Sequence, residues 1–204
     1  MAQPATVFAL WESIDRLCAG EEDFYAGPMY RPEGGHLAPY MFAKLTGAPL
    51  WKGRDFGIGR VRATERQLSP SPNSVFKIVG AKTVGPGSFA GMRVLVHLKR
   101  RLGERVRVWP FEPADPACLT ICEIYPSAYY RLAGSSRTRD SSAVASVLAS
   151  FGAQAEAPPA SQDEADALVS AAALRTLSAK PGAFAVPGPH CRAAEHEGWI
   201  FGTD

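Results

Sequence analysis

One carboxylate stands inside an otherwise apolar run of this sequence. Glu123 lies within Leu119–Tyr125, where its neighbours are Leu, Thr, Ile, Cys, Ile and Tyr. The run predicts a buried central strand with Glu123 near its carboxyl end, which is where open α/β sheets bind ligands. Ionising a carboxylate beside an apolar sheet is costly unless it is paired or binds a metal. Glu123 is therefore either a metal ligand or a strand-end glutamate that pairs with an arginine or reaches water.

Two further carboxylates, Asp163 and Asp166, share one face of a predicted helix because they are spaced i, i+3. Together with Glu123 they could hold Mg²⁺ or Mn²⁺, which prefer hard oxygen ligands. Such ions support hydrolysis of a phosphodiester bond. The alternative is that acidic residues in a first helical turn complement the helix dipole, which suits Asp163 better than Asp166.

A glycine-rich segment precedes another predicted helix. Gly85, Gly87 and Ser88 lead into an apolar helical pattern, with Ser88 expected as the N-cap. Glycines at a helix N-terminus can cradle an anion, although such turns are also common structural features.

Basic residues at the end of this helix and in the strand after it offer a surface for phosphate groups or simply a solvated face. They are Lys99, Arg100, Arg101, Arg105 and Arg107. In a separate segment, Arg60, Arg62 and Arg66 surround Glu65, which indicates either a salt-bridge cluster or a pocket for an anion.

The composition describes an ordinary globular chain. Its 204 residues are 46% hydrophobic and 21% charged, with a net charge of +2, enough for one domain and too balanced to bind polyanions by bulk charge. The four cysteines have irregular gaps without a zinc-type or disulfide pattern. No run is apolar and long enough to span a bilayer, and Val7–Trp11 is too short for a signal peptide. These features predict a cytoplasmic protein with reduced thiols that does not associate with membranes.

The elements that would position these residues form an α/β pattern. Residues 19–72 are rich in Gly, Pro and aromatics and predict a long loop-rich insertion, with a short helix near 39–45. Residues 73–204 form the regular part. Strands are predicted at 105–111, 119–125 and 197–202, and helices at 88–102, 127–134, 140–151 and from 161 onward. A sheet with so few strands would expose an edge, which favours a homodimer through that edge.

Five segments in this order resemble one family: SVFKIVGAKTVGPGSFAGMR, VWPFE, CEIYPSAYYRLAG, DEADALVSAAALRTL and EGWIFG. It is the uncharacterised family of RNase H-like predicted nucleases known as domain of unknown function 429, and the likeness covers roughly residues 8 to 202. The resemblance implies a single RNase H-like domain, in which helices flank a mixed five-stranded sheet, and a metal-dependent nuclease. It also implies that Glu123 occupies the acidic position of the fourth strand and Asp166 that of the last helix, with Asp163 beside it.

The sequence departs from the family pattern at its start. Family members begin with strands that carry a Gly-x-Asp motif, and no such segment precedes Phe8. The first-strand aspartate is therefore absent from this chain, which leaves open that the chain is inactive.

A second likeness keeps a non-enzymatic function open. The segment GPGSFAGMR resembles the GPGSFTGLR element of the tRNA threonylcarbamoyladenosine-modification scaffold subunit, which has an RNase H/actin-like fold. This likeness implies a scaffold or binding protein. The EIYP and DEADAL segments are not expected in that subunit and favour the nuclease family.

Overall fold

Helices dominate the computed structural model of this chain, which describes residues 6–30, 61–68, 73–79 and 83–203. The α-helices are α1 (Val7–Leu17), α2 (Ala63–Leu68), α3 (Gly85–Leu102), α4 (Pro126–Leu132), α5 (Ser141–Ser150), α6 (Gln162–Ser178) and α7 (Cys191–Glu197). Short 3₁₀ helices are η1 (Gly27–Tyr30), η4 (Gly103–Arg105) and η5 (Gly188–His190). The strands are β1 (Val106–Val108) and β2 (Leu119–Ile121), which confirms a mixed α/β chain.

The two strands run parallel, and the chain's last segment extends them. Val106 pairs with Leu119 and Val108 with Ile121. One further parallel bridge joins Glu123 to Ile200, and Phe201 N donates to Glu123 O at 2.9 Å. The predicted strand at 197–202 thus meets the sheet at a single bridge. Within the described ranges the sheet has these parallel segments only, so the five-stranded RNase H-like sheet remains an expectation.

The prediction that β2 is buried was wrong. Leu119 is 56% exposed, and Glu123 is exposed as well. Among the described residues β2 pairs with β1 only, and the bridge to Ile200 is made by Glu123 beyond the end of the strand. The strand is therefore not enclosed like a central strand of a larger parallel sheet. Glu123 therefore reaches its surroundings without the full cost of burying a charge in an apolar sheet.

Groups of the chain itself hydrogen-bond to the backbone polar groups on the outer edge of β1. Trp109 N donates to Ile121 O, so the alternate residues Val106 and Val108 direct their backbone polar groups away from β2. Lys99 Nζ donates to Val106 O at 3.2 Å, and Val108 N donates to Glu112 Oε2 at 2.9 Å. The Glu112 amide completes the edge by donating to Val108 O. The outer edge of β1, one of the two edges through which a homodimer was expected, is thus occupied by the chain itself.

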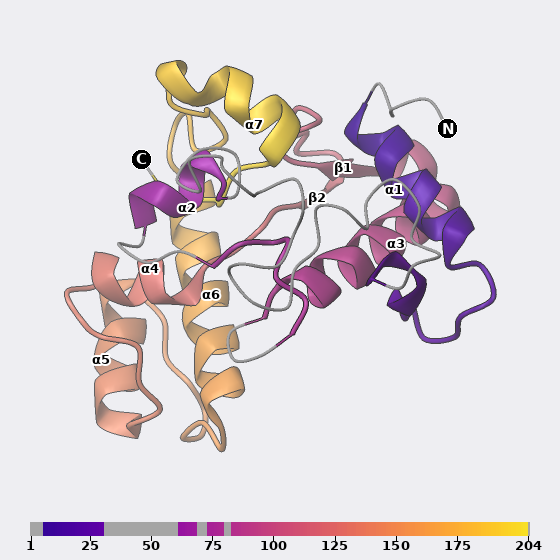
Figure 1. Cartoon of the computed structure of the whole chain (residues 1–204). Coiled ribbons are helices and arrows are strands. Elements are labelled where there is room, and N and C mark those ends of the chain that lie inside the picture. Colours follow the sequence, from indigo (N-terminus) through magenta and orange to yellow (C-terminus); the bar gives the residue numbers. More distant parts are fainter. Residues whose placement is uncertain (1–5, 31–60, 69–72, 80–82, 204) are drawn as a thin grey trace.

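Helices lie on both sides of the strands (Figure 1). The buried hydrophobic side chains form separate clusters among them. On one side α4, α5 and α6 pack around Tyr129, Val147 and Val169, all of which are buried. On the other side α1 lies along α3.

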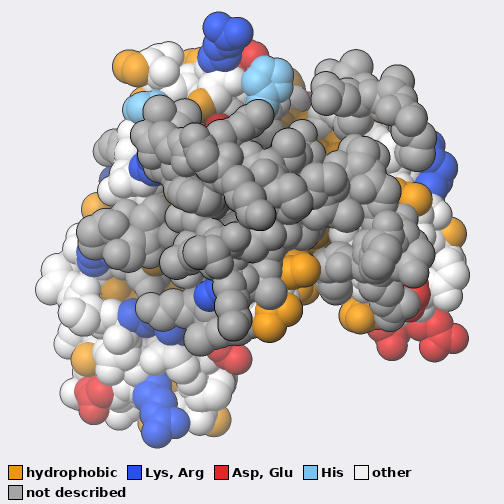
Figure 2. All heavy atoms as spheres, viewed as in Figure 1, with side chains coloured by type: hydrophobic (Ala, Val, Ile, Leu, Met, Phe, Trp, Pro, Cys, Tyr) orange, Lys and Arg blue, Asp and Glu red, His pale blue; other side chains and the backbone are white. Residues whose placement is uncertain are grey.

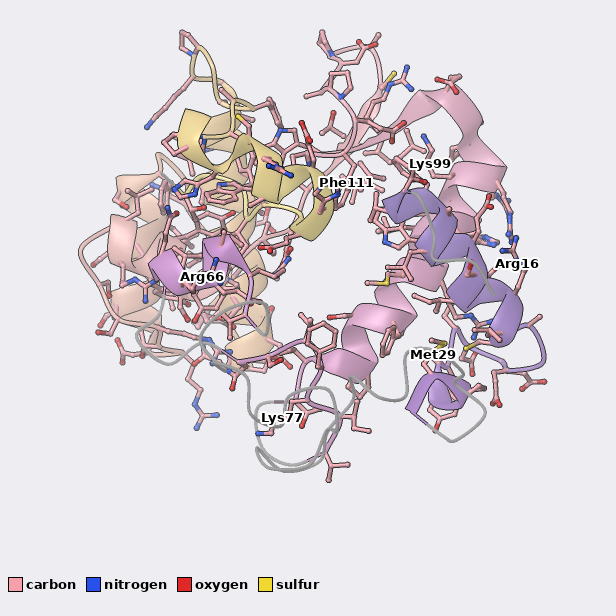
Figure 3. All side chains as sticks on the ribbon, turned by 45° about the horizontal axis from the view of Figure 1, so that its top comes forward. Arg16, Met29, Arg66, Lys77, Lys99 and Phe111 are labelled. Atoms are coloured by element: carbon pink, nitrogen blue, oxygen red, sulfur yellow. The ribbon has the colours of Figure 1, made fainter. Side chains whose placement is uncertain are left out.

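Phe111 lies between these two groups of helices. Its ring makes edge contacts with Phe8 and Trp11 of α1, at centroid distances of 6.3 and 5.4 Å. Its far edge faces Gly198, the residue that follows α7 (Figure 3). An ideal Cβ built at Gly198 would lie 3.3 Å from this ring.

Most of the predicted helices were confirmed with small shifts in their ends. The helix expected from Ser88 begins at Gly85, because Pro86 suits a first-turn position, and its N-cap is Val84 instead of Ser88. Helix α2 lies inside the range predicted as loop, and α7 was not predicted. The helix expected near 39–45 lies outside the described residues. None of the described helices is long and apolar enough to cross a membrane.

Candidate functional site

Arg62 connects the end of β2 to the start of α2. Its Nη1 and Nη2 donate to Oε2 and Oε1 of Glu123, each at 2.6 Å, in a bidentate ion pair. Nη2 also donates to Glu65 Oε1 at 3.0 Å. Two carboxylates from separate elements thus share one guanidinium nitrogen, and we call Arg62, Glu65 and Glu123 the Arg62 cluster.

Local sequence explains the position of Glu65. It is the third residue of α2, and its Oε2 accepts a hydrogen bond from Arg62 N at 3.1 Å. This contact is one half of a capping box, in which a glutamate in the first turn satisfies a free amide at the helix start. The same carboxylate therefore begins the helix and faces the guanidinium.

The C-terminal segment anchors α2 from the other side. Glu197 Oε2 accepts from Ala63 N at 2.8 Å, and Glu197 O accepts from Arg62 Nη1 at 3.2 Å. Thr64, which is fully buried, accepts from Ile200 N through its hydroxyl. These contacts join residues more than a hundred positions apart and place the Arg62 cluster beside the Glu123–Ile200 bridge.

The Arg62 guanidinium is largely withdrawn from solvent, with 17% of the side chain exposed. Burial alone would lower its pKa, but the hydrogen bonds and charges of Glu123 and Glu65 outweigh burial and raise the pKa above its usual value. Among the described residues, its buried Nε has no hydrogen-bond partner.

A pocket of about 180 Å³ opens beside the cluster, and we call it the Glu123 pocket. Glu123 is 44% exposed at its side chain, so its carboxylate remains reachable. The wall combines the ion-pair cluster with apolar and small polar side chains. The lining residues are Arg62, Glu65, Leu68, Asn73, Val75, Val84, Ser88, Glu123, Tyr125 and Ile200.

The charge of the Arg62 cluster favours a cation. With both carboxylates ionised, the cluster carries one more negative than positive charge. An incoming phosphate alone would meet this excess negative charge, whereas a divalent cation would neutralise it. Mg²⁺ is usually held by one or two protein carboxylates together with substrate phosphates. Glu65 and Glu123 match that number, but all four of their oxygens accept hydrogen bonds from Arg62 in this structure.

The predicted helix carboxylates have different neighbours from Glu123. Asp166 receives a bidentate ion pair from Arg137, whose Nε and Nη2 lie 2.8 and 2.5 Å from Oδ2, and Gln162 donates to its Oδ1. Neither Asp163 nor Asp166 lines the Glu123 pocket. Within the described parts of the chain, no three His, Cys, Asp or Glu side chains gather as a metal site. Glu123, Asp163 and Asp166 therefore do not form a group in this structure.

The glycine-rich segment packs against the protein's own backbone. Gly85 N donates to Lys77 O, and an ideal Cβ on Gly85 would lie 2.5 Å from Val75 O. The Ser88 hydroxyl donates to Val84 O at 3.0 Å. Gly85 is therefore required for a close backbone approach, and its amide is already used. Ser88 nevertheless lines the Glu123 pocket, so the predicted anion segment and the predicted acid share one cavity.

Most of the predicted phosphate-binding residues already have partners. Lys99 pairs with Glu112 at 2.7 Å, and Arg100 pairs with Asp15 at 2.6 Å. Arg107 pairs with Glu104 at 2.6 Å, and Arg105 Nε donates to Leu102 O. Arg101 is exposed in the last turn of α3. These contacts stabilise the end of α3 and the edge of β1. The predicted phosphate-binding residues therefore have at least a partly structural role.

Sequence reasoning identified Glu123 but not its partners. The alternation of arginines around Glu65 did indicate a salt-bridge cluster, and Arg62 with Glu65 confirms one. Nothing in the sequence connected this cluster with Glu123, which lies 61 positions beyond Arg62.

Comparison with known proteins adds no relative. No protein-family model matches the chain, and neither a curated protein nor a solved structure matches it.

Proposed function

We propose that this chain is a metal-dependent phosphodiesterase of RNase H-like type acting on nucleic acid, with its reaction centre in the Glu123 pocket. One observation carries the proposal. The carboxylates of Glu65 and Glu123 meet at one nitrogen of Arg62, in a pocket at the carboxyl end of a parallel strand. That position is where α/β proteins bind their ligands.

Glu65 and Glu123 would hold the ion, Mg²⁺ or Mn²⁺, in this proposal. When bound, the ion supplies Lewis-acid stabilisation of a phosphoryl oxygen. Arg62 has a separate anchor in Glu197 O, so it stays beside the site independently of the two carboxylates. Its guanidinium has the planar geometry that donates to two phosphate oxygens at once. Arg62 would thus orient the phosphate while the glutamates provide the hard oxygen ligands.

The proposed ligand set differs from the one that the sequence suggested. There Glu123 acts with Asp163 and Asp166, whereas here it acts with Glu65. Matched amide variants distinguish between these two proposed ligand sets. Both Glu123→Gln and Asp166→Asn remove one carboxylate that accepts a bidentate arginine.

Calorimetric titration with Mn²⁺ tests the proposal directly. We expect the full chain and Asp166→Asn to bind Mn²⁺, and Glu123→Gln and Glu65→Gln to lose binding by at least about tenfold, since each removes one of two protein ligands. Circular dichroism of each variant shows whether it is folded. Loss of binding in Asp166→Asn with retention in Glu65→Gln would support the ligand set suggested by the sequence instead.

Cleavage of labelled single-stranded and duplex oligonucleotides tests the activity. Metal-dependent cleavage that Glu123→Gln abolishes would support a phosphodiesterase. Cleavage that persists in Glu123→Gln would overturn the proposed site.

A non-catalytic binding or scaffold function is the second candidate. The observation that favours it is that arginines already hold two of the three predicted catalytic carboxylates, Glu123 and Asp166, as structural ion pairs do. The same titration distinguishes the two functions: a folded chain that gives no heat with Mn²⁺ or Mg²⁺ and no cleavage would favour the scaffold.

A further inference from the structure

The wall of the Glu123 pocket carries an aromatic ring that the proposed hydrolysis does not use. Tyr125 follows Glu123 by two positions, at the N-cap of α4, and lines the pocket half-buried. In the extended segment after β2, alternate side chains share a side, so Tyr125 and Glu123 border the same cavity. The ring is therefore fixed next to the carboxylate by the backbone itself.

An arginine contacts this ring. The Arg131 guanidinium carbon lies 5.9 Å from the centre of the Tyr125 ring, in a cation–π contact. Arg131 Nη2 also donates to Leu68 O at 2.9 Å, and Leu68 lines the pocket too. This hydrogen bond fixes an exposed cation at the rim beside an aromatic ring.

The surroundings of the ring are apolar and accessible. Val84 is 37% exposed. Val84 belongs to the pocket wall. Arg137 and Arg139 are exposed on the segment after α4, although Arg137 already pairs with Asp166 and neither residue lines the pocket. Figure 2 shows Lys and Arg side chains on the α4 and α5 part of the surface. An aromatic and aliphatic rim with flanking cations suits a flat, uncharged ring attached to a phosphate backbone.

We infer that Tyr125 and Arg131 form a stacking platform for an unpaired base, which makes single-stranded nucleic acid the preferred ligand of the Glu123 pocket. Proteins that bind single strands combine aromatic rings that stack on bases with cations that contact the backbone. A base in a duplex has its faces covered by its neighbours and cannot occupy the platform without leaving the stack. The inference builds on the proposed function, because the platform would hold the strand beside the carboxylates.

Fluorescence anisotropy with a labelled single strand about ten nucleotides long tests the platform. The titration contains EDTA, so that binding is measured without hydrolysis. We expect Tyr125→Ala to weaken binding roughly tenfold and Tyr125→Phe to keep it, since the ring and not the hydroxyl stacks. Arg131→Ala should weaken binding and flatten its salt dependence. Tyr25→Ala is the matched control, because Tyr25 is 48% exposed but does not line the pocket.

Equal affinity of Tyr125→Ala and the unaltered chain would overturn the inference, as would a duplex that binds as tightly as the single strand. The two proposals fail separately. If cleavage requires Glu123 but Tyr125→Ala binds the single strand normally, the platform is refuted and the phosphodiesterase is supported. If binding of the single strand depends on Tyr125 but the chain does not bind Mn²⁺, the phosphodiesterase is refuted and the platform is supported.

Discussion

At the scale of single residues, arginine partners decide what each carboxylate can do. Glu123 and Asp166 looked alike in sequence, as carboxylates within apolar patterns. Arg62 holds the first at a pocket with a second carboxylate, and Arg137 holds the second at the start of α6. Their chemistry therefore depends on neighbours contributed by distant segments.

The Arg62–Glu123 pair should contribute modestly to stability. Glu123 is 44% exposed, so solvent screens the pair, and we expect a coupling energy of about 1 kcal/mol. A double-mutant cycle with Arg62→Gln and Glu123→Gln, measured by urea unfolding, gives this value. A coupling energy near zero would show that the pair does not hold α2 against β2.

Asp140 should make stability depend on acid pH. It caps α5, where its Oδ1 accepts from the Ser142 hydroxyl at 2.7 Å and from Ala143 N at 2.9 Å. These hydrogen bonds lower the pKa of Asp140 below its usual 3.8. A lowered pKa means that the stabilisation is complete above this usual value and is lost as pH falls through the lower pKa of the folded state.

Asp140→Asn keeps a capping side chain but removes the titration. We therefore expect its melting temperature to fall less steeply than that of the unaltered chain below pH 3.8. Parallel melting curves across this pH range would contradict an acid-sensitive cap.

At the scale of elements, capping residues and helical periodicity predict the longer helices, whereas the shortest helices depend on tertiary contacts. Asp140 and Ser161 cap α5 and α6 through their side chains, and both helix starts were predicted. Helices α2 and α7 have six and seven residues, too few to be stable in isolation. Their positions depend on each other through Glu197 and Ala63, which no local pattern reveals.

The start of α3 should tolerate no side chain at Gly85. Gly85→Ala brings a Cβ against the carbonyl oxygens of Val75 and Lys77, at 2.5 and 2.8 Å, and we expect a loss of about 1–3 kcal/mol. Gly91→Ala is the control, since nothing lies within 4 Å of its Cβ position and alanine favours a helix. Thermal unfolding should show a lower melting temperature for the first variant only; equal effects would contradict the close approach.

At the scale of the whole molecule, the filled edge of β1 should keep the chain monomeric. Lys99 and Glu112 occupy the polar groups that a second chain would pair with. Light scattering should therefore give a monomer at micromolar concentration. Glu112→Ala frees Val108 N and should cause self-association, whereas Glu104→Ala should not, because Glu104 is 87% exposed and pairs with Arg107 outside this edge. A dimeric unaltered chain would contradict this account.

Part of the candidate site was predictable and part was not. Glu123 was identifiable because a charged residue interrupts an apolar run, although the burial cost inferred from that run does not apply at this exposed position. Arg62 and Glu65 were identifiable as a pair because they are three positions apart. The predicted metal site with Asp163 and Asp166 needed α6 to bring these side chains to Glu123. The helix was predicted correctly, but its carboxylate faces Arg137.

By itself, the sequence determined the α/β alternation, the capped helices α5 and α6, the extended segments before and at Glu123 and the arginine–glutamate pattern at residue 62. These depend on periodicity, caps and spacing, which act over a few residues. Only the tertiary structure decided that α2 meets β2, that Arg62 takes Glu123 as a partner, and that Tyr125 and Ser88 border one pocket. Those contacts join segments tens of residues apart, and their energies arise only when the whole chain has folded.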